Sequence, residues 1–456
     1  MKIVLFLISM LAPTVAGMTL FYREQTFSRT ETIIFSFTLG TGLLSYYLFF
    51  LMVFNIPFSA LSVTLFFLPF FVYGAYGAFR FKGIIERFHS PLRSPLSGLP
   101  TIHKCIFILL SLLVAWKLFF MLFMILSGPT AFWDAYTLWN FKAKTIFYQG
   151  AQGSAGEVFG GEYTHYPLHL PLMRAWVALV MGHWDDSFAN LHSFVLFLCL
   201  LGTVYMTLQR YLRKTIALVL TSVMTCVPIL TYNVISGYAD MALGYYFLAA
   251  AIMLSSWHKT GNTRYLIFTG IIASTAMFTK NEGVAIVFPS LVITLLFNLF
   301  SARRPWRYVL TSAAVFLFSC LLILLWLKES GALSSILTIS GLRGSPFVFH
   351  PEGLNPLAHH LFIFRNYNLF LAGLLLLLVV KGKGPVGAEA RFFLLPAILS
   401  LCAILYVFLF THNVEWLLNG TTINRAMLIV VPLFTVLAGF LLLPEGALCA
   451  DAGEGA

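Results

Sequence analysis

Charged side chains are scarce in this sequence: they make up 10% of its 456 residues, whereas 59% are hydrophobic. Soluble domains carry about 25% charged residues, so the scarcity excludes an ordinary soluble domain. Polar and apolar residues also fail to alternate as they do in the strands of an outer-membrane barrel. The apolar residues instead form runs of about 17 to 25, the length of a helix that crosses a bilayer. The sequence therefore predicts an all-α, polytopic transmembrane helical bundle.

Cysteines are few, and no two of them have the CxxC spacing that is typical of metal and redox sites. The six cysteines lie far apart, each in or beside an apolar run, at positions 105, 199, 226, 320, 402 and 449. Cysteine behaves as a small hydrophobic residue in such surroundings. We interpret all six as packing residues rather than as a disulfide framework.

About twelve to thirteen apolar runs are candidate membrane spans. They lie near residues 3–22, 31–55, 58–79, 105–127, 190–208, 215–232, 240–256, 265–279, 283–300, 308–327, 361–380, 392–411 and 426–443. The first run resembles a signal peptide, but the second follows at once, which favours an uncleaved helix. We expect N-terminal transmembrane helices and a cytoplasmic loop in 1–104, a membrane core in 105–443 and a short tail in 444–456.

The net charge of +11 has a topological explanation. If the run at 105–127 points outward, the loops on the inner side carry 16 Lys and Arg residues and those on the outer side carry seven. The side that is richer in basic residues is usually cytoplasmic. Ten of the 17 acidic residues fall on the other side. The charge therefore does not indicate nucleic-acid binding, and the polar chemistry is predicted to lie on the outer face.

Three outer segments, at 128–189, 328–360 and 412–425, are long enough to hold structure. The first is rich in aromatic residues, which predicts helices that lie in the membrane interface. The second mixes Gly, Ser and Pro with apolar residues, and we expect it to act as a lid that brings Arg343 near a bound phosphate.

Two carboxylates are the candidate catalytic groups, because each stands where a span meets an outer loop. Asp134 follows the run at 105–127, and Asp240 begins the run at 240–256. A carboxylate at such a place usually lines a water-filled cavity. Helix N-capping is the competing interpretation for both residues. The pair Asp185-Asp186 is interpreted as a cap for the next span.

Other polar residues of the outer loops are candidates for binding a phosphorylated, hydroxyl-rich substrate. The turn Lys280-Asn281-Glu282 stands between two apolar runs, and Arg425 begins the last span, where its guanidinium could bind a phosphate in a bidentate manner. Lys142 and Lys144 are further candidates, although snorkelling lysines explain them as well. The spacing of His165 and His169 suits a metal site, but Pro167 lies between them and disfavours it.

Several motifs, in their order, resemble a known family. They are WDAYTLWNFKAK, HYPLHLP, GYADMALG, FTKNEG and NRAMLIVVP, which lie between about 130 and 432. This pattern is similar to that of the bacterial GT-C membrane glycosyltransferases, near the protein-mannosyltransferase and aminoarabinose-transferase-like enzymes. The resemblance implies a GT-C fold for 105–443 and an enzyme that transfers a sugar from a polyprenyl-phosphate carrier on the outer face of the membrane, usually with inversion.

The resemblance also implies roles for individual residues. Asp134 matches the essential acidic residue of the first outer loop, and Asp240 matches the second acidic residue. The HYPLHLP segment, with His165 and Tyr166, matches the membrane-surface helices, and Lys280 with Glu282 matches a polar turn.

Two departures from the family bear on the acceptor. Ala135 stands where protein mannosyltransferases have a second acidic residue, and only residues 444–456 follow the last span, where many relatives carry a periplasmic domain. Both favour a lipid-linked or glycan acceptor.

The expected protein is thus a multi-pass glycosyltransferase of the bacterial inner membrane with its site toward the periplasm. Its expected partners are a polyprenyl-phosphate-linked sugar, the acceptor and membrane lipid. No cofactor is assigned, since a divalent cation between Asp134 and Asp240 lacks a third ligand and metal-independent catalysis is favoured. A ligase or polymerase of lipid-linked glycans and a flippase or transporter are the alternative functions.

Overall fold

The computed structural model describes residues 1–21, 26–78, 96, 99–130, 132–150, 166–301, 305–330, 348–364, 366–381, 389–420 and 422–443. Every regular element in these ranges is a helix. The α-helices of ten or more residues are α1 (Lys2–Phe21), α2 (Arg29–Val53), α3 (Ala60–Ala78), α5 (Thr101–Leu126), α6 (Asn140–Gln149), α8 (His169–Met181), α9 (Asp186–Gln209), α10 (Lys214–Thr225), α12 (Ala239–Thr260), α13 (Thr263–Met277), α14 (Phe288–Ser301), α15 (Trp306–Ser330), α18 (Phe370–Lys381), α19 (Arg391–Leu409) and α22 (Val431–Leu441). This confirms the predicted all-α polytopic bundle.

Shorter elements join these helices. They are α11 (Pro228–Ser236), α17 (Leu354–Ala358), α20 (Val414–Leu418) and α21 (Ile423–Ala426), the π-helical turns η1 (Ala135–Trp139), η3 (Gly283–Val287) and η5 (His359–Ile363), and the 3-10 turns η4 (Pro351–Gly353) and η6 (Met427–Ile429).

Of the expected lid at 328–360, residues 331–347 with Arg343 lie outside the described ranges. Its last part packs against α19 and α20 through η4.

Eight helices within the described ranges are long and apolar enough to cross a membrane. Two bent pairs bring this number to ten: α10 with α11, at 66°, and the segment Ile423–Ile429 with α22, at 53°. Proline explains both bends, because Pro228 and Pro432 stand in the first turn after each break and cannot donate a backbone hydrogen bond. Of the other three expected spans, 58–79 contains the shorter apolar part of α3, and 265–279 overlaps α13. The expected span at 361–380 is helical only in its second part, as α18, because its first residues belong to a π-helical turn that ends at Ile363.

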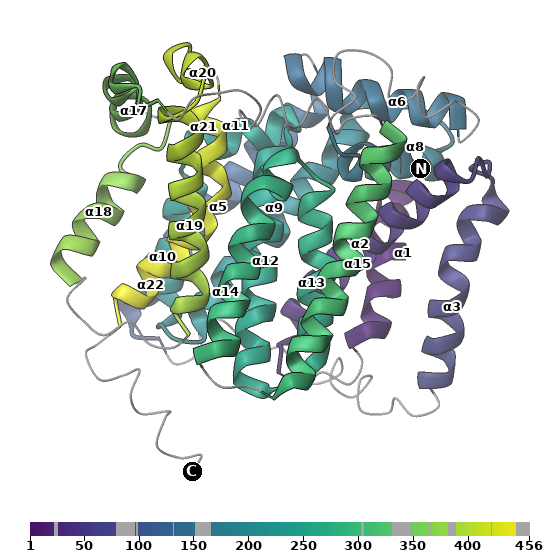
Figure 1. Cartoon of the computed structure of the whole chain (residues 1–456), viewed down its shortest axis with the longest axis horizontal. Coiled ribbons are helices and arrows are strands. Elements are labelled where there is room, and N and C mark those ends of the chain that lie inside the picture. Colours follow the sequence, from purple (N-terminus) through teal and green to yellow (C-terminus); the bar gives the residue numbers. More distant parts are fainter. Residues whose placement is uncertain are drawn as a thin grey trace.

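The helix α12 stands in the middle of the bundle (Figure 1). Its residues from Ala239 to Trp257 are all buried, and it contacts α9, α11, α13, α14, α19 and α22. By contrast, α5 lies at the periphery and buries only Phe107, Met121 and Ile125. In a membrane the exposed apolar side chains of α5 would contact lipid, which explains why they are not buried within the protein.

The N-terminal helices pack against this core. The two helices α1 and α2 touch through their backbones: a Cβ atom on Gly40 would lie 1.8 Å from the Pro13 carbonyl oxygen. Small residues allow this close approach, which is a usual source of helix association in membranes. Two side chains of α8 then attach the pair to the core. The Trp176 indole donates to the Ser9 carbonyl oxygen at 2.7 Å, and His169 lies 2.9 Å from Ser45 Oγ and 2.7 Å from Tyr246 Oη.

The glycine contact between α1 and α2 can be tested. In Gly40→Ala the new methyl group would overlap the backbone of α1, so the two helices must separate, and we expect a loss of stability of about 1–3 kcal/mol. Thermal unfolding of the purified protein in detergent would show this as a lower Tm. Gly373→Ala in α18 is the matched control, because its Cβ would meet no atom within 4 Å. Equal Tm values for the two variants would contradict the close packing.

Candidate functional site

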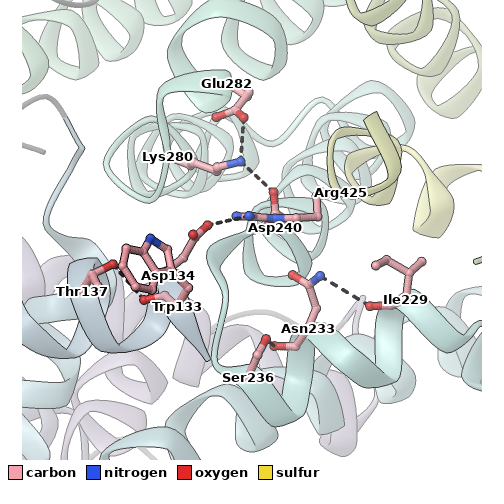
Figure 2. A network of polar contacts seen from close by, with 10 residues as sticks. All are labelled: Trp133, Asp134, Thr137, Ile229, Asn233, Ser236, Asp240, Lys280, Glu282 and Arg425. Carbon is pink, nitrogen blue, oxygen red and sulfur yellow. Dashed lines mark hydrogen bonds and ion pairs between the residues drawn. The ribbon is translucent and has the colours of Figure 1, made fainter. Parts of the chain in front are cut away.

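Five charged side chains meet in a row, which we call the ion-pair chain: Asp134, Arg425, Asp240, Lys280 and Glu282 (Figure 2). Arg425 Nη1 lies 2.5 Å from Asp134 Oδ2, and Arg425 Nε lies 3.1 Å from Asp240 Oδ2. Lys280 Nζ lies 2.6 Å from both Asp240 Oδ1 and Glu282 Oε1. The structure thus brings together five residues that were selected from four separate parts of the sequence.

The ion-pair chain is buried at its centre and open at its ends. The Asp240 side chain has no exposed surface, and that of Lys280 is 4% exposed. The side chains of Glu282 and Asp134 are 24% and 30% exposed. Interactions between charges are strongest where water is excluded, and a buried charge must be paired to be tolerated. Asp240 is therefore the buried centre of the arrangement, and the two terminal carboxylates are partly exposed.

An irregular helix turn follows each of the two terminal carboxylates of the ion-pair chain. Asp134 directly precedes η1, and Glu282 directly precedes η3. Neither side chain accepts a capping hydrogen bond from its own helix, so the capping interpretation of Asp134 is wrong. The wider π-helical turn redirects the side chains around it and is frequent at functional sites. Gly283 permits this turn to approach α13, since a Cβ atom there would lie 2.1 Å from the Ala276 carbonyl oxygen.

Asp240 is not a capping residue either. It lies in the first turn of α12, whose N-cap is Tyr238, and its two carboxylate oxygens contact Lys280 and Arg425. Asp185, by contrast, accepts hydrogen bonds from the backbone N–H groups of Ser187 and Phe188, so its predicted capping role is confirmed.

Arg425 is held from two sides. Its guanidinium lies 4.3 Å from the centre of the Tyr238 ring, a cation–π contact. The segment that carries it approaches α12 at Gly244, where a Cβ atom would lie 2.8 Å from the Leu428 carbonyl oxygen. Gly244 stands one helical turn after Asp240, so this close approach brings Arg425 to the carboxylate.

A fully buried arginine, Arg174, connects the two segments that carry Asp134 and Asp240. Arg174 of α8 is fully buried, and its Nη1 donates to Asn140 Oδ1 at 2.7 Å, just after η1. Its Nη2 donates to the Gly237 carbonyl oxygen, three residues before Asp240. From the sequence alone, Arg174 is one of the seven basic residues of the outer loops and has no predicted role in the site. The sequence does contain a signal for its importance, because Arg174 lies within an apolar helix and charged residues in such helices usually have a function.

The remaining residues that the sequence suggests for substrate binding are found in several parts of the structure. Lys142 is buried and donates to the Tyr166 carbonyl oxygen at 2.9 Å, and Lys144 lies 3.3 Å from Asp186, so neither joins the ion-pair chain. The half-buried Asn281 stands between Lys280 and Glu282. His165 lies outside the described residues.

Tyr166 lies close enough to the ion-pair chain to respond to its charges. Burial raises the pKa of the Tyr166 hydroxyl to about 12. The carboxylates of Glu282 and Asp134 also raise this pKa, whereas Lys280 and Arg425 lower it. Its ring meets that of Trp139 edge to face, with the ring centres 5.5 Å apart. Tyr166 therefore connects the aromatic first outer loop with the charged residues.

Metal ions in proteins are usually held by a cluster of His, Cys, Asp or Glu side chains. In the described part of the chain, no three His, Cys, Asp or Glu side chains gather as a set of metal ligands. The carboxylates of the ion-pair chain contact Lys280 and Arg425 instead.

These features define a membrane-embedded helical protein with a charged site at the ends of several helices. Residues 165–326 match the model of the dolichyl-phosphate-mannose-protein mannosyltransferase family. The matched stretch includes Asp240, Lys280 and Glu282, whereas Asp134 and Arg425 lie outside it. No curated protein matches the chain. The family match supports the resemblance to GT-C membrane glycosyltransferases and indicates a glycosyltransferase.

Lys142 gives a pH-dependent prediction. Burial lowers the pKa of the Lys142 amine to about 7, whereas the amine of an unfolded chain keeps a value near 10.4. Between these values the unfolded state binds a proton that the folded state does not, so stability rises with pH, by at most about 1.4 kcal/mol per pH unit. We therefore expect the Tm of the wild type to rise relative to that of Lys142→Met between pH 7 and 9.5. Parallel curves for the two proteins would contradict this.

Proposed function

We propose that this protein transfers a sugar from a polyprenyl-phosphate carrier to a hydroxyl group of a lipid-linked or glycan acceptor on the outer face of the membrane. The observation that supports this most is the ion-pair chain, in which two cations and three carboxylates stand together at helix ends. Such a set suits a reaction that needs cations for a phosphate and a carboxylate for a proton.

In this reaction the cations and the carboxylates of the ion-pair chain have different roles. The acceptor oxygen attacks the anomeric carbon, the bond between that carbon and the phosphate oxygen breaks, and the configuration inverts. The phosphate leaves as an anion, and Lys280 and Arg425 stabilise its charge. The acceptor hydroxyl loses its proton as the new bond forms, and Asp134 accepts that proton. Asp240 holds both cations in place, because it contacts each of them.

The proposed location follows from the charges of the loops. The residues of the ion-pair chain belong to the set of loops that carries few basic residues, which the positive-inside rule places away from the cytoplasm. Lys259 and Glu389, from loops of the opposite set, pair with each other at 2.5 Å. We propose the bacterial inner membrane with the site toward the periplasm. A periplasmic site would meet polyprenyl-linked sugars at the lipid boundary.

The role of Asp134 as the base can be tested directly. In Asp134→Asn the side chain keeps its shape but cannot accept the proton, so transfer should fall by about 10²- to 10⁴-fold while the protein stays folded and binds the donor. Transfer of a radiolabelled sugar in proteoliposomes would measure this. The control is Asp186→Asn, which removes a carboxylate that pairs with Lys144 outside the ion-pair chain. Near-normal transfer by folded Asp134→Asn would remove this residue from the mechanism.

Lys280 should act through its charge. Lys280→Arg keeps a cation between Asp240 and the phosphate, whereas Lys280→Ala leaves a buried carboxylate with one cation fewer, a change that costs about 3–5 kcal/mol. We expect Lys280→Arg to retain more transfer and a lower KM for the donor than Lys280→Ala. Tm values measured in parallel separate lost folding from lost binding. Equal KM values for wild type and a folded Lys280→Ala would show that the lysine does not bind the donor.

A further inference from the structure

The charges of the ion-pair chain do not balance. They alternate in sign from Asp134 to Glu282, and three carboxylates stand against two cations. One negative charge is therefore in excess. A polyprenyl-phosphate-linked sugar brings a further negative charge, and like charges that are close together in a poorly hydrated site repel strongly. A donor therefore cannot simply be added to this arrangement. At least one of the carboxylates must give up its cation.

The three carboxylates differ in how firmly they are held. Asp240 is fully buried and contacts both cations. Glu282 contacts a cation only through Lys280, and its side chain is 24% exposed. Asp134 likewise contacts one cation, Arg425, and is 30% exposed. Each cation thus has one permanent partner, which is Asp240, and one partner at the exposed edge of the site.

Glu282 is the better candidate for displacement at Lys280. It directly follows Asn281 in the turn between α13 and η3, and its carboxylate holds Lys280 Nζ at 2.6 Å, the same distance as Asp240. A phosphate oxygen that took the place of the Glu282 carboxylate would keep the coordination of Lys280 and would leave the buried pair with Asp240 intact. Displacement of Asp240 would instead leave a fully buried charge without its partner, which is far more costly.

We propose, on the basis of the function proposed above, that Glu282 is a placeholder for the carrier phosphate. The carboxylate occupies Lys280 when the site is empty and moves outward when the phosphate arrives. The phosphate also draws Arg425 away from Asp134, so that the Asp134 carboxylate is released to act as the base only when a donor is bound.

The same exchange helps the product to leave. The donor is a phosphodiester with one negative charge, but the polyprenyl phosphate that remains after transfer is a monoester, which carries about −1.5 to −2 charges at pH 7. The two cations would hold this product more tightly than the donor. The return of Glu282 to Lys280 opposes that binding. Glu282 therefore tunes affinity for the anionic carrier and limits inhibition by the product.

Binding of polyprenyl phosphate to the purified full-length protein in nanodiscs of neutral lipid tests this proposal. Glu282→Gln keeps the size of the side chain but removes the competing charge, so we expect its Kd to fall by about 3- to 10-fold, with Glu282→Asp closer to the wild type. Glu352→Gln is the matched control, since this exposed carboxylate contacts His350 and lies outside the ion-pair chain. Its Kd should not change. Lys280→Met should weaken binding by at least about 10-fold, because its phosphate contact is lost.

The outcomes separate this proposal from the proposed function. An unchanged or higher Kd for folded Glu282→Gln overturns the placeholder role, even where the wild type binds polyprenyl phosphate and Lys280→Met does not. A wild type that binds polyprenyl phosphate no better than uncharged polyprenol overturns the proposed function itself. Glu282→Ala provides a second variant without the carboxylate. Failure of both Glu282→Gln and Glu282→Ala to fold, judged by Tm and gel filtration, also contradicts the proposal, because a side chain that leaves its partner in each cycle cannot be essential for folding.

Discussion

The organisation of the site depends on one constraint: the carboxylate of Asp240 is buried in the most enclosed helix of the bundle. A charge without access to water is tolerated only with close partners of opposite sign. Lys280 and Arg425 supply them, from the turn after α13 and from the short helix before α22. Because both cations must reach the same carboxylate, the ends of three helices are drawn together. The remaining members of the site are arranged around that junction.

Irregular turns at the ends of the helices allow the charged residues to contact one another. Regular helices that meet at a membrane surface would carry their side chains along fixed stripes. Here η1 and η3 follow Asp134 and Glu282, and the last span bends by 53° just beyond Arg425. Glycine at position 244 removes the bulk that would keep the Arg425 segment away from α12. The buried guanidinium of Arg174 then ties the loop of Asp134 to that of Asp240.

Much of this could be predicted from the sequence, for physical reasons. Apolar runs are local features, and the asymmetry of basic residues between loops is a simple count, so the helical bundle and a set of loops with few basic residues that carries the charged site follow directly. The polar turn at 280–282 and the two aspartates were found because charged residues are costly beside hydrocarbon.

The partners of these residues could not be predicted. Arg425 and Asp134 are separated by 291 positions, and their contact depends on packing between helices that no local pattern reveals. For the same reason the sequence does not single out Tyr238 and Arg174, and it does not decide between a cavity and helix capping for Asp134 and Asp240. The π-helical turns have no recognisable sequence pattern here. Lys142 and Lys144 were selected for their charge, but each has a partner within the first outer loop, which only the folded chain shows.

The central claim is that Lys280 and Arg425 together hold the phosphate of a polyprenyl-linked substrate. A cryo-electron-microscopy structure of the full chain in nanodiscs with a non-hydrolysable polyprenyl-phosphate sugar tests it most directly. We predict phosphate oxygens within hydrogen-bond distance of Lys280 Nζ and of the Arg425 guanidinium, with Asp240 still between the two cations. A phosphate bound elsewhere, with all four ion pairs of the chain intact, would contradict the account.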